Sequence, residues 1–364
     1  MTAKPKRLWR APIAGKGVGG IAADAKYVVA SGRALNDTLD LWRCYDAATG
    51  AEVWTLRYPA AGKLDYGSSP RATPLLHDGR AFLAGAFGHL HAVDLATGRV
   101  LWKKDLAAEY PPAREMTWGL CASPLIADGK LIVCPGSNDA LLVALDTATG
   151  AVVWKSPGGP AGYGSFLLAE LGGKRQIVGL DAESLGGWDP ATGKRLWRIQ
   201  PEHKGDFNVP TPVVAAGMLI FATEGNATRA YRFRPDGTPD PMAVAVYESM
   251  APETASPVAI GDRMFGLPGG LHCINVSANL KPVWVGQDDE LGDHASLIAS
   301  GSRVLIVTMT AEAILIDATA NTFRILGRHK LVANEDGVYA HPAVVGTTLY
   351  LRGSDAVYAF ELSQ

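Results

Sequence analysis

The sequence predicts an all-β fold, an eight-bladed β-propeller built from four-stranded antiparallel blades. Two patterns, each repeated along the chain of 364 residues, predict it. In one, an Asp enters a turn that ends in Thr-Gly, and a Trp follows the Gly. In the other, a small residue precedes Ser, Thr or Pro, two apolar residues and a turn that contains Gly or Asp. Repeats spaced by roughly 40–50 residues are typical of propellers and solenoids.

The Asp…Thr-Gly…Trp motif has the chemistry of a β-hairpin. The Asp caps the turn by accepting backbone hydrogen bonds, and the Gly takes the positive φ that a short loop requires. We expect the Trp to pack its flat ring against the neighbouring unit. Four copies are well formed, and their structural residues are Asp46, Gly50, Trp54, Asp94, Gly98, Trp102, Asp146, Gly150, Trp154, Asp189, Gly193 and Trp197.

The second pattern sets the number of blades at eight. Each copy reads as two short strands around a turn, a third strand follows, and the Trp-bearing stretch makes a fourth. The copies begin near Gly19, Ala72, Ala122, Gly164, Val209, Ala255, Ala295 and Ala340. Units five to eight lose parts of the Asp…Thr-Gly…Trp motif. No linker or low-complexity stretch interrupts the repeats, so we expect residues 1–364 to form a single domain.

The two ends of the chain are expected to meet. The eighth unit ends at Val357–Leu362 with no fourth strand after it. Arg7–Arg10 can supply that strand, which would put Trp9 in the role that Trp154 has in its own unit. Such a pairing closes the ring and hides the edges of the sheets.

Composition excludes several classes of partner. The formal net charge is −2 and charged residues make up 19% of the chain, with both signs mixed, so no basic surface is expected for nucleic acid. No apolar run reaches the length of a membrane span. The four cysteines form no CxxC pair and are expected to be buried free thiols. We expect a monomer.

The repeats resemble the pyrroloquinoline-quinone (PQQ)-like β-propeller proteins, in the stand-alone form abundant in planctomycete-type bacteria. The wider superfamily includes quinoprotein alcohol dehydrogenases, with WD40-like architecture, and more distantly the outer-membrane assembly factor BamB. Besides the Trp motifs, the resemblance is carried by Gly88–Asp94, Trp118–Cys134, Ala161–Ala169, Asn208–Val214 and Ala340–Phe360. It implies a periplasmic or secreted protein, whereas the residues after Met1 contain no apolar signal-peptide core.

The resemblance also suggests PQQ as a cofactor, but the sequence departs from the dehydrogenases. These enzymes are much longer and carry two adjacent cysteines against the quinone, and no two cysteines are adjacent here. They hold Ca²⁺ with a set of Glu, Asn and Asp residues, and no compact set of that kind is visible. We therefore expect no cofactor, no metal site and no catalytic residue.

Candidate binding residues come from the geometry of a propeller. The first strand of each blade lines the central channel, so the residues entering these strands surround one mouth, where ligand sites tend to form. Seven of the eight units place a polar or aromatic group there. These residues are Arg71, Trp118, Tyr163, Asn208, Glu253, His294, Tyr339 and His341. The same residues could instead pack blade to blade and hold water.

Two classes of function remain open. The first is a non-catalytic binding or scaffold protein whose mouth holds a glycan-like polar ligand or a protein partner. Aromatic faces stack on sugar rings, and charged groups bond the ring substituents. The second is an enzyme that uses the same mouth. It would be a PQQ-dependent dehydrogenase or a polysaccharide lyase-type enzyme, with Tyr163 or His294 as base and Arg71 neutralising a carboxylate.

Overall fold

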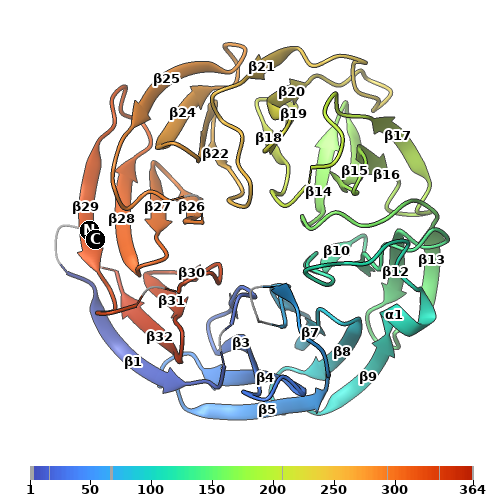
Figure 1. Ribbon diagram of the computed structural model, residues 1–364, viewed down its shortest axis with the longest axis vertical. Helices are drawn as coiled ribbons and strands as arrows, with labels where there is room; N and C mark the ends of the chain where they lie inside the picture. The colour runs from blue at the N-terminus through green and yellow to red at the C-terminus, as the bar shows by residue number, and fades with distance from the viewer. Residues whose placement is uncertain are drawn as a thin grey trace.

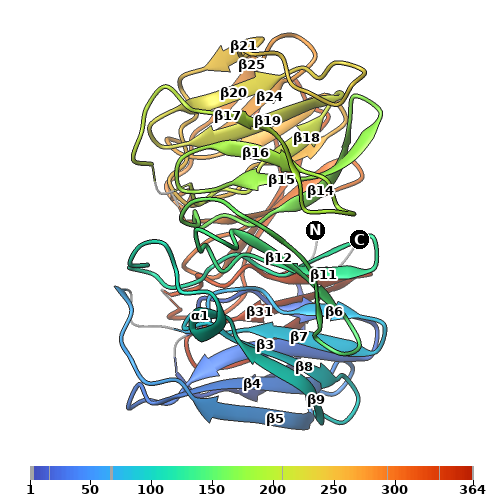
Figure 2. The same ribbon diagram turned by 90° about the vertical axis from the view of Figure 1, so that its right-hand side faces the viewer.

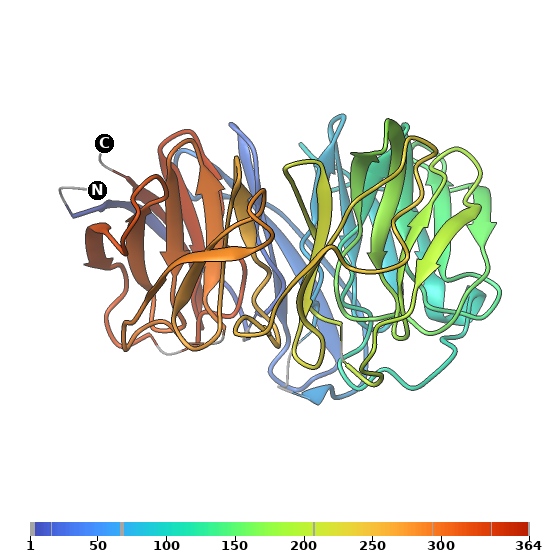
Figure 3. The ribbon, with the colours of Figure 1, turned by 90° about the horizontal axis from the view of Figure 1, so that it is seen from above.

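The computed structural model describes residues 4–15, 17–65, 69–206, 208–292, 294–335 and 337–362. It is an eight-bladed β-propeller, which confirms the fold predicted from the repeats. Eight antiparallel sheets of four strands each stand in a ring around a central channel (Figure 1). Edge-on views show the sheets standing side by side around the ring (Figures 2 and 3).

Each blade runs from an inner strand at the channel to an outer strand at the rim. The strands of blades 1 to 4 are β2 (Ala22–Ala23), β3 (Tyr27–Arg33), β4 (Leu39–Asp46) and β5 (Glu52–Pro59); β6 (Leu75–His77), β7 (Arg80–Ala84), β8 (His89–Asp94) and β9 (Val100–Asp105); β10 (Leu125–Ala127), β11 (Lys130–Val133), β12 (Leu142–Asp146) and β13 (Val152–Ser156); β14 (Leu167–Leu171), β15 (Lys174–Leu180), β16 (Leu185–Trp188) and β17 (Arg195–Ile199). The strands of blades 5 to 8 are β18 (Val213–Ala215), β19 (Met218–Thr223), β20 (Ala227–Tyr231) and β21 (Ala245–Tyr247); β22 (Val258–Ile260), β23 (Arg263–Gly266), β24 (Leu271–Asn275) and β25 (Lys281–Gly286); β26 (Ser296–Ser300), β27 (Arg303–Val307), β28 (Glu312–Asp317) and β29 (Ile325–Lys330); β30 (Ala343–Val345), β31 (Thr348–Arg352), β32 (Ala356–Glu361) and β1 (Lys6–Pro12). One short helix, α1 (Leu106–Glu109), lies at the rim after β9.

The termini close the ring as the sequence predicted. β1 pairs antiparallel with β32, so the first strand of the chain is the outer strand of blade 8. Trp9 pairs with Ala359 next to a register shift. Its indole N–H donates to the carbonyl of Ala47 in blade 1 over 2.9 Å. This hydrogen bond from the first strand of the chain therefore connects blade 8 to blade 1.

The repeated Trp packs on the turn of the next blade. The indole of Trp54 donates to the carbonyl of Leu95 over 2.8 Å, and Trp102 and Trp154 make the corresponding bonds with Thr147 and Pro190. The turn Gly lies against the same ring. A Cβ added to Gly98 would come within 2.6 Å of Trp54. Gly is thus required here both for its positive φ and for this close approach.

The turn Asp also acts as predicted. In blade 3, Asp146 accepts hydrogen bonds from the backbone N–H groups of Ala148 and Thr149 and from the Thr149 hydroxyl. These bonds stabilise the carboxylate and lower the pKa of Asp146. The hairpin is therefore held by side-chain-to-backbone bonds that the sequence motif encodes locally.

The junction between blades 4 and 5 differs, because its indole bonds a side chain. Trp197 donates to the side-chain oxygen of Gln176 over 2.6 Å, and the Gln176 amide donates to the carbonyl of Gly237 in blade 5. Gln176 therefore relays the bond that the other indoles make directly. Between blades 6 and 7, Trp284 donates to Ala320 over 3.0 Å.

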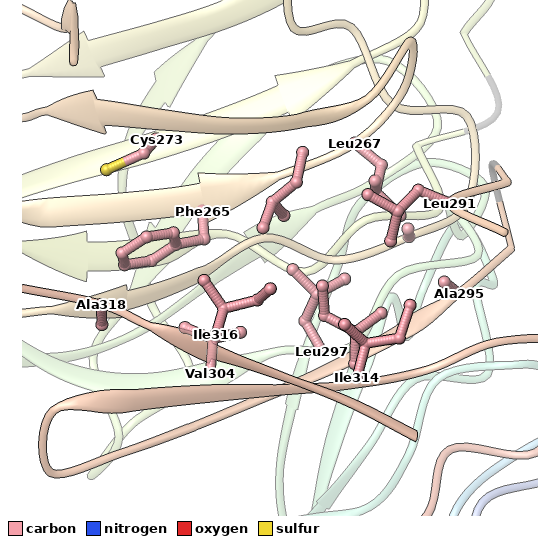
Figure 4. Packing of buried hydrophobic residues seen from close by; sticks show 13 residues of the cluster. Phe265, Leu267, Cys273, Leu291, Ala295, Leu297, Val304, Ile314, Ile316 and Ala318 are labelled. Atoms are coloured by element: carbon pink, nitrogen blue, oxygen red, sulfur yellow. The ribbon is translucent and has the colours of Figure 1, made fainter. Parts of the chain in front are cut away.

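The hydrophobic core is divided into clusters between neighbouring blades. In the cluster between blades 6 and 7, Phe265, Cys273 and Leu267 from one sheet face Ile314 and Ile316 from the next (Figure 4). All five are fully buried. Removing such apolar surface from water, blade against blade, is the main stabilising term for the ring.

Candidate functional site

One end of the channel opens into a cavity of about 680 Å³. Its walls come from every blade, because the loop entering each inner strand reaches the same mouth. Seven of the eight sequence-predicted residues line it, and they are Arg71, Trp118, Tyr163, Glu253, His294, Tyr339 and His341. A volume of this size is in the range that holds small-molecule ligands. That these residues bind a ligand stays a prediction.

Two aromatic pairs face the cavity from opposite sides of the ring. Trp118 and Tyr163, on the loops entering blades 3 and 4, have ring centroids 4.7 Å apart and planes tilted by 52°. His294 and Tyr339, on the loops entering blades 7 and 8, have centroids 6.0 Å apart in an edge-to-face arrangement. In a ring of eight, blades 3 and 4 lie across from blades 7 and 8. A ligand in the mouth therefore meets aromatic surface on two sides.

Opposite charges lie across the other diameter. Arg71 enters blade 2 and donates a hydrogen bond to the carbonyl of Asp65. Glu253 enters blade 6 and is exposed to solvent. Glu224, in the turn between β19 and β20, also lines the cavity. The mouth therefore presents one guanidinium and two carboxylates to a ligand, besides its aromatic faces.

Two side chains hold the aromatic pairs in position. The hydroxyl of Thr254 lies 2.8 Å from Nδ1 of His294, which fixes the orientation of the imidazole. The guanidinium of Arg114 lies 6.0 Å from the centre of the Tyr163 ring and donates to the carbonyl of Ala161. Arg114 thus supports the Tyr163 side of the mouth from behind.

A series of hydroxyl groups joins the inner strands below the mouth. The backbone N–H of Thr73 donates to the Ser123 hydroxyl over 3.0 Å, and the N–H of Ser123 donates to Ser165 over 3.0 Å. The series continues from Ser165 to Thr211 and from Thr211 to Ser256. These bonds fix the inner ends of blades 2 to 6 relative to one another. The mouth is therefore preorganised by a rigid frame.

Asn208 is a correction to the predicted set. Its side chain is buried and donates to the carbonyl of Asp181 in blade 4 over 2.7 Å, and its carbonyl accepts from the N–H of Gly164. The residue has a φ of 54°, and this left-handed conformation goes with a side chain directed into the protein. Thr211 and Glu224 line the cavity on the blade 5 side instead.

Burial changes the acid–base properties of two groups at the cavity. It raises the pKa of the Cys121 thiol to about 12, an effect that Arg71 partly opposes, so the thiol stays protonated at neutral pH. Protein surrounds the imidazole of His341 although its edge reaches the channel, and the resulting desolvation lowers its pKa. His341 is therefore neutral at neutral pH and acts as a hydrogen-bonding group.

The sequence reasoning missed several residues of the mouth. Thr254 and Arg114 carry no motif, and Glu224 follows the second strand of its blade, β19, where the inner-strand rule does not look. The hydroxyl series does have a signal, because Thr73, Ser123, Ser165, Thr211 and Ser256 all fall in the Ser/Thr position of the second repeated pattern. The same pattern that sets the number of blades therefore also marks the residues of this hydrogen-bonded series.

Among the described residues, which run from 4 to 362 with five short gaps, no three His, Cys, Asp or Glu side chains gather so that they could hold a metal ion. Across the same described residues, no helix has both the length and the apolar character needed to cross a bilayer. All four cysteines are free thiols.

Comparison with known proteins finds relatives of two kinds, BamB proteins and quinoprotein alcohol dehydrogenases. The family described as outer membrane protein assembly factor BamB matches residues 39–238. BamB of Shewanella oneidensis is 21% identical over 337 residues, covering 78% of this chain and 82% of that protein. The quinoprotein alcohol dehydrogenase PedH of Pseudomonas putida is 29% identical over 179 residues, covering 46% of this chain and 28% of PedH. The chain thus matches little more than a quarter of PedH.

Solved structures share the fold. BamB from Moraxella catarrhalis superposes with a TM-score of 0.64 at 16% identity, covering 98% of this chain and 100% of that one. The quinohemoprotein alcohol dehydrogenase from Comamonas testosteroni gives 0.67 at 14% identity, covering 98% of this chain and 76% of the enzyme. At these identities the likeness concerns the eight-bladed ring and not the chemistry of the mouth.

Proposed function

The chain belongs to the family of the outer membrane protein assembly factor BamB, and we propose that it is a non-catalytic binding propeller whose mouth holds a carbohydrate-like ligand. The observation that carries the proposal is the pair of aromatic walls, Trp118 with Tyr163 and His294 with Tyr339, on opposite sides of one cavity. Apolar ring faces stack on the C–H faces of sugars, while charged groups bond their hydroxyl or carboxylate substituents. Arg71 and Glu253 supply both signs of charge between the walls.

The proposal is tested by thermal shift with a panel of defined polysaccharides: a neutral β-glucan, polygalacturonate, alginate and chitosan. One class should raise the melting temperature. A ligand present at 100 times its Kd stabilises the folded state by roughly 2.7 kcal/mol, which is roughly 3–4 °C for a chain of 364 residues. Trp118→Ala and Arg71→Ala should abolish the shift and keep the far-UV circular dichroism of the parent.

Lys130→Ala is the matched control, because Lys130 begins β11 at the end of the blade away from the mouth. It should keep the full thermal shift. If Trp118→Ala and Arg71→Ala bind the same polysaccharide as tightly as the parent, the mouth is not the binding site.

Family membership favours a second candidate for the same mouth, a protein partner. The BamB of Shewanella oneidensis is named as an outer membrane protein assembly factor, and this chain covers 82% of its length. Cavity loops from all eight blades would then contact a polypeptide instead of a glycan. This candidate is favoured if the panel gives no thermal shift and if Trp118→Ala removes a co-purifying protein that Lys130→Ala retains.

The dehydrogenase relatives suggest an enzymatic alternative, with PQQ in the mouth. The aromatic walls and Arg71 suit the planar ring and carboxylates of the quinone. Among the described residues, however, no three His, Cys, Asp or Glu side chains gather, so a metal beside the quinone would have fewer than three such ligands. Incubation with PQQ and Ca²⁺ should therefore leave no bound-quinone absorbance band after gel filtration. A retained band would favour the dehydrogenase over the binding protein.

A further inference from the structure

The junction between blades 7 and 8 lacks the tryptophan that six of the eight outer strands carry. In the outer strands that carry it, the Trp occupies one position of the register, opposite the residue before a register shift. Trp54 pairs there with Cys44, and Trp154 pairs with Ala144. In blade 7 the same position is Gly327, which pairs with Leu315. Among the described outer strands, six carry the indole: Trp9, Trp54, Trp102, Trp154, Trp197 and Trp284.

A cavity of about 410 Å³ opens at this junction. Four of its lining residues stand in the register positions that surround Trp54 in the junction between blades 1 and 2. Leu305, Leu315, Val344 and Leu362 correspond to Val29, Cys44, Leu76 and Leu95, respectively. Leu305 and Leu315 are 6% and 8% exposed, whereas Val29 and Cys44 are 0% exposed. The cavity is therefore the position of the missing indole, left open.

The hydrogen-bond acceptor for an indole is also in place. In the junction between blades 1 and 2, the Trp54 N–H donates to the carbonyl of Leu95, whose own N–H donates to Gly79 over 2.9 Å. The N–H of Leu362 makes the equivalent bond to Thr347 over 2.8 Å. The carbonyl of Leu362 thus occupies the place of the Leu95 carbonyl. The site combines an apolar slot with a polar acceptor, the two features that an indole requires.

The rim of this slot is polar and carries a positive charge. Ser300, Ser302, Thr347 and Arg303 line the cavity from the turns of blades 7 and 8. The Arg303 side chain is exposed, and among the described residues it makes no ion pair. A guanidinium at the edge of an apolar slot favours an acidic group next to the aromatic ring that enters.

We propose that this slot binds the tryptophan side chain of a partner polypeptide in which an acidic residue next to the tryptophan contacts Arg303. The slot lies at the turns that follow the inner strands, whereas the mouth residues precede those strands. The two sites are therefore on opposite faces of the ring, and this proposal does not depend on the ligand of the mouth.

The test uses ¹⁹F NMR of a pentapeptide, Gly-Asp-Trp-Asp-Gly, that carries 5-fluorotryptophan. The parent protein should shift and broaden the fluorine signal in a saturable way. Gly327→Trp supplies the missing indole from β29 and should weaken peptide binding by roughly tenfold or more, because the slot is then filled. Binding that survives Gly327→Trp in a folded protein overturns the proposal, as does a parent that gives no saturable shift.

A surface variant keeps the test valid if Gly327→Trp does not fold. Arg303→Glu should weaken the acidic peptide roughly two- to fivefold, the size of an exposed ion pair, and should not weaken a Gly-Lys-Trp-Lys-Gly peptide. Its matched control is Lys130→Glu. Lys130 has the register position of Arg303 in blade 3, where Trp154 fills the slot. Equal effects of the two charge reversals would contradict a site at the junction of blades 7 and 8.

A variant truncated after Leu362 tests whether the occupant of the slot is a partner or the end of this chain. If a partner tryptophan is the natural occupant, deleting Ser363 and Gln364 should leave the peptide affinity within roughly twofold of the parent. A gain of roughly tenfold or more would mean that the chain's own last residues compete for the slot, and would overturn the proposal.

Discussion

The junction between blades 1 and 2 buries Trp54 against Leu95 and Gly98, whereas the junction between blades 7 and 8 has Gly327 at the position of that Trp. Both junctions still close, because apolar side chains such as Leu349, Leu351 and Phe360 pack the rest of the second one. The ring therefore depends on the number of blades and on their apolar faces more than on any single indole. The Trp is a local addition that fills one position near the rim.

Two histidines at equivalent positions in blades 2 and 6 also differ in their contacts. His91 and His272 have equivalent register positions in blades 2 and 6, next to the residue that pairs with Trp. His272 is bonded by both ring nitrogens, to the Tyr247 hydroxyl at 3.0 Å and the Pro268 carbonyl at 2.9 Å. His91 stacks on Tyr58, and its buried Nδ1 has no hydrogen-bond partner among the described residues. Equivalent positions thus impose burial but not bonding.

The largest effect is expected at the filled junction. Trp54→Ala should lower the free energy of unfolding by about 3–5 kcal/mol, because a large side chain is removed from a packed site. Leu326→Ala, at the partly buried outer strand of blade 7, should cost only about 1 kcal/mol. Guanidinium chloride unfolding followed by circular dichroism measures both. Equal losses would show that the two junctions do not differ in packing.

The next largest effect is expected in the pH dependence of stability, which His91 and His272 should influence differently. Burial lowers the pKa of His91 from 6.5 to about 4. The unfolded chain therefore binds a proton below pH 6.5 that the folded chain does not accept until about pH 4, so stability is lost as the pH falls through this range. The loss is about 3 kcal/mol. His91→Phe keeps the stacking on Tyr58 and should remove this part of the acid sensitivity.

His272→Phe is the comparison for that prediction. It leaves the Tyr247 hydroxyl and the Pro268 carbonyl without their partner, so it should destabilise the protein by about 1–3 kcal/mol at neutral pH. Unfolding midpoints of the parent and both variants at pH 7 and pH 5 separate the two roles. A His91→Phe protein as acid-sensitive as the parent would disprove the assignment for His91.

The smallest contrast concerns two turn glycines with positive φ. Gly50 has a φ of 72° and lies against Trp9, where an added Cβ would come within 2.6 Å of the ring. Gly346 has a φ of 58°, and nothing lies within 4 Å of its added Cβ. Gly346→Ala should therefore cost about 1–2 kcal/mol for its backbone conformation alone. Gly50→Ala should cost about 1–3 kcal/mol more, measured in the same unfolding experiment. Equal costs would mean that Trp9 moves away freely.

Much of the mouth could be predicted from the sequence because a propeller brings the start of every inner strand to one place. Arg71, Trp118 and His294 follow from that rule alone. The rule fails at Asn208, whose left-handed backbone goes with a side chain bonded to blade 4. It also misses Glu224, because the turn between β19 and β20 reaches the mouth from a different part of its blade.

By itself the sequence determined the hairpins, the number of blades and the meeting of the two termini, since each depends on a short local pattern. Asp146 and Thr149 are neighbours in the chain, and their local hydrogen bonds are enough to specify the turn. Only the tertiary structure decided which side chains face one another across the channel. The cavity at the position of the missing Trp, where Gly327 stands, likewise exists only because blades 7 and 8 pack side by side in the ring. These features depend on the packing of different blades, whose residues are distant in sequence, and no local pattern encodes that packing.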